Sequence, residues 1–322
     1  ETGLSDTEPF IENGLDVYLM KADFIDCMLE CQKFGFSEEQ KQEAMTGMKT
    51  RLMLSGKFPD YPNSEALIDE NVLQSQKLTD ELSQFISDHK MSGQLAISSS
   101  LIDFHFDLST TGGAVDYSLT GNSARHLIAT WIKHLIVCAS ATSIRPEQNR
   151  LEQEQPEQMH ESENGPRSVT VCIVKNTQAK TVSIKTEQFN YIEQEQAQAY
   201  LTTLLDIFRR GLERPLLLAP DFADKLLSGI QADPSFDPYA ATADDFFRHP
   251  EIANRWSTFF DATNFPSPFV VDKYFSHYFP QYVDKDKKTI SDLLAIYQPL
   301  KKHMLAKSTT KKSAKNAKKG SV

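Results

Sequence analysis

The chain has 322 residues, of which 40% are hydrophobic and 24% are charged, and its formal net charge is −10. This composition excludes a disordered or fibrous protein and allows a sizeable core. No apolar run approaches the roughly 18 residues of a membrane span, and the first residues lack the pattern of a secretory signal, so we expect neither a membrane protein nor a secreted one.

The four cysteines, Cys27, Cys31, Cys138 and Cys172, lie in apolar surroundings. They form no CxxC pair and have no histidines at zinc-ligand spacing. This pattern predicts buried, reduced thiols without a metal site. Reduced thiols are typical of a cytoplasmic protein.

The charge is distributed unevenly along the chain. Eight lysines and no acidic residue lie in the last 22 residues, so the rest of the chain carries a net charge of −18. A free-standing DNA-binding protein normally presents a basic surface. We therefore expect DNA contacts to be local, or to be made within a larger complex.

The predicted elements begin with three helices in the region 15–92, after a lead-in linker over residues 1–14. Apolar residues at helical spacing predict a first helix from Leu15 to Leu29. The second is predicted over Ser37–Leu54, with Ser37 and Gln40 as a capping box. The third is predicted over Ser64–Lys90.

The spacing of apolar residues then changes to the pattern typical of β-strands. Three β-favouring runs, Gln94–Ser98, Leu101–Leu108 and Gly113–Leu119, predict an antiparallel meander. A helix follows, capped at Asn122–Ser123 and ending at Ala139. Residues 145–167 are rich in Glu and Gln and predict a solvated loop.

Two further strands and a helix complete the predicted core. The strands are predicted over Val169–Val174 and Thr181–Lys185, and the helix over Glu193–Arg210, ending at Gly211. Strands alternating with helices predict an α/β fold with a core over residues 93–212.

The remainder predicts a helical appendage over residues 213–305. Its predicted helices are Asp221–Gln231, Asp244–Phe260, Val270–Phe279 and Thr289–Lys302. Residues 306–322 are rich in lysine, serine and threonine and predict a disordered tail. The main domain is thus expected over residues 15–305.

Several local runs resemble RecC proteins. The run Gly121–Ser140 is similar to the helix that follows a β-meander in that family, with matching points at Trp131, His134, Leu135, Cys138, Ala139 and Ser140. Further agreement lies at Glu8–Phe10, Ser55–Pro59 and Arg210–Pro220. The resemblance extends in order over residues 8–305, although the loop 145–167 is longer than expected and the lysine tail has no counterpart.

This resemblance implies the C-terminal domain of RecC, the gamma subunit of exodeoxyribonuclease V. In the family that domain has a PD-(D/E)xK nuclease-like core, with a mixed sheet flanked by helices, that has lost its catalytic residues. It lies beside the RecB and RecD subunits, where RecC splits the DNA duplex and guides single strands. Mg²⁺ and ATP would belong to the partner subunits, and this chain would need no cofactor.

The residues at the nuclease positions are consistent with a lost activity. Asp103 and Asp116 stand where the family pattern has carboxylates, and Ser118 stands at the lysine position. A hydroxyl cannot supply the positive charge that phosphodiester hydrolysis requires beside the phosphate. We predict no catalytic residue and no metal site. The alternative is a divergent Mg²⁺-dependent nuclease that uses Asp103, Asp116 and a lysine relocated to Lys175 or Lys185.

Basic and aromatic residues in the appendage have the types found in single-strand channels. The candidates for DNA binding are Arg248, Arg255, Trp256, Lys273 and Tyr274. Aromatics at helical spacing are more commonly part of a core, so packing is the competing interpretation. A stand-alone protein-interaction domain outside DNA repair is the third functional hypothesis.

Overall fold

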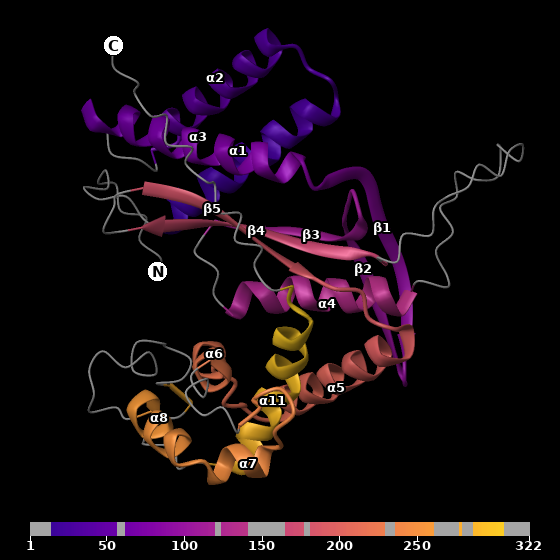
Figure 1. Cartoon of the computed structure of the whole chain (residues 1–322). Coiled ribbons are helices and arrows are strands. Elements are labelled where there is room, and N and C mark those ends of the chain that lie inside the picture. The colour runs from indigo at the N-terminus through magenta and orange to yellow at the C-terminus, as the bar shows by residue number, and fades with distance from the viewer. Residues whose placement is uncertain are drawn as a thin grey trace, which may run out of the picture.

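A five-stranded mixed sheet separates two sets of helices (Figure 1). The computed structural model describes residues 14–56, 62–119, 124–140, 165–176, 181–228, 236–260, 277–278 and 286–305. The helices α1 to α3 lie on one face of the sheet, and α4 and α5 lie on the other. The predicted α/β class, with a mixed sheet flanked by helices, is confirmed.

The strands are ordered along the sheet as they are along the chain. They are β1 (Ile86–Ile97), β2 (Ser100–Ser109), β3 (Gly112–Ser118), β4 (Arg167–Asn176) and β5 (Thr181–Phe189). The first three pair antiparallel, which confirms the predicted meander. Helix α4 (Ala124–Ser140) then allows β4 to pair parallel to β3, and β5 returns antiparallel.

The N-terminal layer comprises α1 (Gly14–Lys33), α2 (Glu38–Leu54) and α3 (Pro62–Ser83). Helices α1 and α3 pack on the sheet through one buried cluster, whose residues are Ile25, Leu78, Leu82, Val115, Leu119, Val169 and Val171. The predicted capping box of α2 is confirmed, because Ser37 Oγ accepts from the Gln40 backbone amide and Gln40 Oε1 accepts from the Ser37 amide.

The opposite layer centres on the buried Trp131 of α4. Its ring packs against Phe189 of β5, with ring centroids 5.3 Å apart, and stacks on His303 at 5.9 Å. Helix α5 (Gln194–Glu213) completes this layer by burying Ala197 and Leu201. The apolar stripe predicted on α4 therefore forms the main contact between the helices and the sheet.

The described C-terminal helices form a second core beside α5, and Leu300 of the last of them also joins the cluster beneath α4. They are α6 (Pro220–Ser228), α7 (Ala243–Arg248), α8 (Pro250–Phe260) and α11 (Lys287–His303). Trp256, Phe222 and Tyr297 are buried among them. Arg210 of α5 donates two hydrogen bonds to the Asp292 carboxylate of α11, at 2.7 and 2.8 Å, and so joins the appendage to the α/β core.

Several predicted helix boundaries are wrong. The first helix, predicted to end at Leu29, continues to Lys33. The helix predicted to reach Lys90 ends at Ser83, because Ile86 already pairs with Ser109 as the start of β1. Helix α5 continues through Gly211 to Glu213. The helix predicted over 244–260 is broken at His249, whose extended conformation is what a following proline imposes.

Some predictions fall on residues outside the described ranges. They include the lead-in over residues 1–13, most of the loop 145–167, the tail 306–322 and most of the helix predicted over 270–279, of which only residues 277–278 are described. Within the described residues, no helix has the length and apolar character needed to cross a bilayer.

Three of the four cysteines are buried, as the sequence predicts, and Cys27 is not fully buried. All four are free thiols; Cys31, Cys138 and Cys172 are buried, and Cys27 is half-buried. Burial raises the pKa of Cys138 to about 11, so this thiol stays protonated at neutral pH.

Gly113 of β3 lies where the backbones of β3 and β4 approach each other closely. A Cβ atom on Gly113 would collide with the backbone of Arg167 and Ser168, at the start of the parallel pairing between β3 and β4. The Gly113 amide donates to Ser109 Oγ at 3.0 Å. Only glycine fits where these strands converge.

Candidate functional site

Three polar side chains from neighbouring strands form a row on the sheet face that α4 covers. Asp116 of β3 pairs in register with Thr170 of β4, and Thr170 pairs with Glu187 of β5. Paired residues of neighbouring strands project to the same side of a sheet. The Thr170 hydroxyl donates to Thr130 Oγ1 of α4 at 2.7 Å. The row therefore lies beneath α4.

A cation from α4 binds the carboxylate of Asp116. Lys133 Nζ donates to Asp116 Oδ2 at 2.8 Å, and Thr130 Oγ1 lies 3.5 Å from the same oxygen. Thr130 and Lys133 reach one carboxylate because helix positions three apart share a face. The Tyr117 amide donates to Oδ1 at 3.0 Å. Both oxygens of Asp116 are thus engaged by groups of the protein itself.

A second ion pair lies at the other end of the row. Lys185 Nζ is 2.5 Å from Glu187 Oε1, and the side chain of Glu187 is only 2% exposed. Burying a carboxylate is costly unless a cation or hydrogen bonds compensate. The sheet face thus carries two acids, each paired with a lysine. Lys185 is one of the two lysines predicted as a relocated catalytic lysine, whereas no sequence pattern points to Glu187 or Lys133.

The predicted carboxylate set is not brought together. Asp103 is exposed and accepts a hydrogen bond from Gln94 Nε2 at 2.7 Å on the outer face of the β1–β2 hairpin. Its neighbours Ile102 and Phe104 point the other way, into the cluster beneath α4. Because successive strand residues alternate faces, Asp103 and Asp116 lie on opposite sides of the sheet.

Ser118 is buried at the end of β3 and pairs in register with Cys172, which pairs with Lys185. Ser118 therefore lies on the same face as Asp116 and does not share a face with Asp103. The side chain of Lys175 lies outside the described part of the structure. Across the described residues, no three His, Cys, Asp or Glu side chains converge closely enough to hold a metal ion.

The sequence matches the family model of the RecC C-terminal domain over residues 1–231, which is more than half of the chain. The chain belongs to the RecC family. This family is part of the exodeoxyribonuclease V complex, which acts in DNA repair and recombination. Among curated proteins, no sequence matches the chain.

The RecC match includes the whole polar row and both of its lysines. It also includes the helices α1 to α3, and it ends just after α6. The predicted DNA-binding residues all follow the matched range. The family match therefore covers the α/β core and does not extend to the helices after α6.

The DNA-binding candidates of this RecC chain differ in their exposure. Arg248 is exposed at the end of α7. Arg255 is half-buried and lies 3.4 Å from Glu251 Oε2 on the same helix. Lys273 and Tyr274 lie outside the described residues.

The prediction of Trp256 as a stacking platform is wrong for this conformation. Its side chain is fully buried and meets Phe222 edge to face, with ring centroids 5.3 Å apart. A base can stack only on an exposed ring face. Trp256 is a core residue of the appendage, as the packing interpretation of the helical spacing had it.

A network of hydrogen bonds between neutral groups lies deeper between α4 and the sheet. His134 is buried; its Nε2 donates to the carbonyl oxygen of Asn190 at 2.7 Å, and its Nδ1 lies 2.8 Å from Ser168 Oγ. Ser168 Oγ accepts from the Ala114 amide at 2.9 Å. The Asn190 carbonyl fixes the tautomer, since it requires a proton on Nε2. These hydrogen bonds connect α4 of the RecC domain to β3, β4 and the end of β5.

Proposed function

We propose that this chain is the non-catalytic scaffold and strand-guiding domain of the gamma subunit of RecBCD exodeoxyribonuclease V. The observation that carries the proposal is the pairing of Asp116 with Lys133 at 2.8 Å. The family match favours this role over a stand-alone interaction domain outside DNA repair.

Hydrolysis of a phosphodiester by a PD-(D/E)xK site depends on carboxylates that converge on Mg²⁺ and on a lysine beside the attacking water. In this chain the Asp116 carboxylate already accepts from an ammonium group, and Asp103 lies on the opposite sheet face. An ammonium at the carboxylate neutralises the charge that would attract a cation. The sheet and helix remain as a rigid support without the arrangement that hydrolysis needs.

The rest of the proposal follows from the family. The chain would assemble with RecB and RecD in the cytoplasm and contact DNA at a duplex end and along its single strands. Mg²⁺ and ATP would be used by the partner subunits. The exposed Arg248, with Lys273 and Tyr274, remains a candidate for contact with DNA. The acidic body of the chain supports contacts that are local to such residues.

The test uses a neutral pair in the reconstituted RecBCD complex. The double variant Asp116→Asn with Lys133→Met removes both charges of the pair together, so that no charge is left unpaired. We expect ATP-dependent DNA degradation at the wild-type rate, because neither residue takes part in hydrolysis. Loss of degradation with unwinding retained would show that the row is catalytic.

One observation favours a second candidate, a divergent metal-dependent nuclease. Glu187 lies on the same sheet face as Asp116, and this face also carries Lys185, so that two carboxylates and a lysine share it. This set differs from the predicted one, since Glu187 takes the place of Asp103. Calorimetric titration with Mn²⁺ tests it: binding by the wild-type chain that Glu187→Gln abolishes and Asp103→Asn preserves would favour the nuclease.

A further inference from the structure

Helix α2 lacks the buried face that normally holds a helix to its protein. None of its 17 residues is buried. Met45, Met48 and Leu52 are only partly covered, and Met53 and Leu54 are exposed. Most helices in proteins depend on burying an apolar face, because isolated helices of this length are marginal in water. Part of the apolar face of α2 is therefore available to another molecule.

A groove of about 430 Å³ runs between α2 and α3. Its wall on α2 extends from Glu38 to Lys49, and its wall on α3 extends from Asp69 to Asp80. Each wall spans eleven residue steps, which correspond to about 16 Å of helix at 1.5 Å per residue. The groove thus has the length of about three helical turns.

The deeper lining of the groove is apolar and pliable. Met28 and Cys31 of α1 line it together with Met45 of α2 and Val72 of α3. Methionine side chains adapt to differently shaped partners because they are unbranched and polarisable. Such a lining accepts the apolar stripe of an amphipathic helix, which binds by inserting every third or fourth residue.

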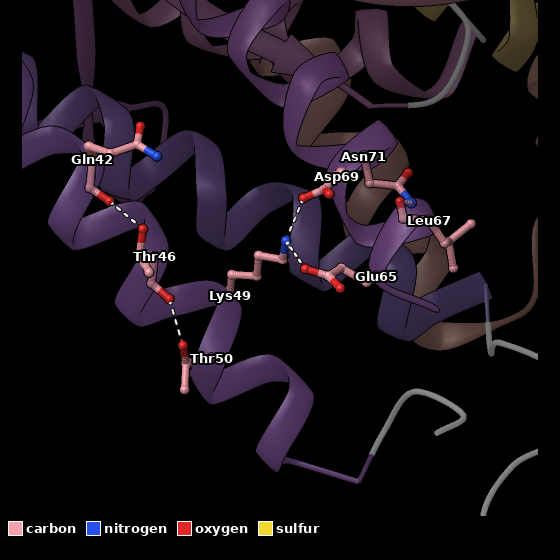
Figure 2. Close-up of polar contacts among 8 residues, drawn as sticks. All are labelled: Gln42, Thr46, Lys49, Thr50, Glu65, Leu67, Asp69 and Asn71. Carbon is pink, nitrogen blue, oxygen red and sulfur yellow. Dashed lines mark hydrogen bonds and ion pairs between the residues drawn. The ribbon is translucent and has the colours of Figure 1, made fainter. Parts of the chain in front are cut away.

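Several polar groups around the groove have partners within the chain (Figure 2). Lys49 of α2 bridges Glu65 at 3.0 Å and Asp69 at 2.8 Å, and so closes one end against α3. These two hydrogen bonds raise the pKa of Lys49. The hydroxyls of Thr46 and Thr50 donate to carbonyls of their own helix. The groove offers to a ligand its apolar lining, the side-chain amides of Gln32, Gln42 and Gln76, and its net charge.

The net charge of the helices around the groove is negative. Helices α1, α2 and α3 carry twelve acidic and six basic side chains. Glu38 and Asp80 are both exposed on the rim, where Lys41 pairs with Glu38 at 2.6 Å. Complementary charge directs association and discriminates against acidic partners. A ligand that matches this surface is basic on the side that faces the rim.

We propose that this groove receives a basic amphipathic helix of about three turns from a partner protein of the assembled complex. The proposal rests on the scaffold function proposed above and specifies the surface and the chemistry of one contact. The helix would place its apolar stripe against Met28, Met45 and Val72 and its basic residues beside Asp80 and Glu38. Helix α2 would become buried only in the complex.

Site-specific photo-crosslinking in the reconstituted complex with RecB and RecD tests the position of the contact. A photo-reactive amino acid replaces Thr46, which lines the groove, or Glu43, which is exposed on α2 away from it. We expect the Thr46 probe to capture a partner segment with helical apolar periodicity and basic residues, at least tenfold more than the Glu43 probe. Equal yields, capture of residues 306–322 of the same chain, or capture of a second copy would overturn the proposal.

A pair of charge reversals tests the electrostatic part. Asp80→Lys and Glu43→Lys change the net charge equally at exposed positions, but only Asp80 lines the groove. We expect Asp80→Lys to weaken assembly about tenfold at low salt, and Glu43→Lys to have less than a twofold effect. Equal effects would refute the groove contact. If both variants assemble normally and Thr46 captures nothing, the groove proposal fails while the scaffold function stands.

Discussion

Protonation of the buried His134 is expected to destabilise the fold in mildly acidic solution. Its Nε2 donates to the Asn190 carbonyl, and its Nδ1 accepts from the Ser168 hydroxyl, so the neutral ring satisfies both partners. Burial lowers the pKa of His134 to about 4. The cause is the loss of hydration that a charged imidazolium would suffer between α4 and the sheet.

The size of the effect follows from the two pKa values. A histidine in the unfolded chain has a pKa near 6.5. The folded-state pKa is lower, so the unfolded state binds the proton more tightly between pH 6.5 and pH 4. The stabilisation from neutral His134 is therefore complete above pH 6.5 and is lost as the pH falls towards 4. A difference of about 2.5 in pKa corresponds to about 3 kcal/mol in the free energy of unfolding.

Urea denaturation at pH 7, 6, 5 and 4 measures this dependence in the wild type and in His134→Gln. The variant should be about 2 kcal/mol less stable at pH 7, because Ser168 and Asn190 lose a buried partner. Between pH 7 and pH 4 it should lose about 3 kcal/mol less than the wild type. His303, whose pKa burial also lowers, is present in both proteins, so its own titration contributes to both curves.

The control variant His105→Gln removes an exposed imidazole from β2 and should keep the wild-type pH dependence. Parallel loss of stability in His134→Gln and the wild type would refute the reasoning. It would mean that groups other than the hydrogen-bond network of His134 with Ser168 and Asn190 control the acid sensitivity of the fold.

Further substitutions test the sheet, the polar row and the appendage. Gly113→Ala should cost at least about 3 kcal/mol in urea denaturation, because its Cβ would collide with the backbone of Arg167. Lys133→Met should cost about 1–2 kcal/mol by leaving the Asp116 carboxylate without its cation, and adding Asp116→Asn should recover most of that loss in a double-mutant cycle. Trp256→Ala should cost about 3–5 kcal/mol, whereas Trp256→Phe should leave single-stranded DNA affinity unchanged in a fluorescence anisotropy titration, because the indole is buried.

Elements with a strong local pattern were predictable from the sequence. The capping box of α2 needs only Ser37 and Gln40 at the correct spacing, and the structure contains both of its hydrogen bonds. The stripe that includes Leu127, Trp131 and Leu135 predicted α4, and all three side chains are buried. Such signals suffice because they arise within a few turns of one helix.

Other boundaries depend on contacts that are distant in sequence. Residues 84–90 mix polar and apolar side chains without a clear period, and the pairing of Ile86 with Ser109 makes them part of a strand. The break between α7 and α8 had a local signal, since a residue before proline avoids the helical conformation and His249 precedes Pro250. That signal was outweighed by the apolar spacing on either side.

The polar row required knowledge of strand register. Nothing local in the sequence places Glu187 beside Thr170, or Lys133 over Asp116, because these neighbours come from different strands and from a crossing helix. The position of Asp103 did have a signal. Apolar residues alternate with polar ones along β2, and Asp103 falls on the polar positions that face away from α4.

The most direct test of the central claim is digestion of end-labelled linear DNA by this chain alone, with 10-fold steps of Mg²⁺ or Mn²⁺. The proposed scaffold role predicts no degradation above that of a metal-free control at any concentration. Degradation that requires the metal and disappears in Glu187→Gln would contradict the claim and make the row beneath α4 an active site.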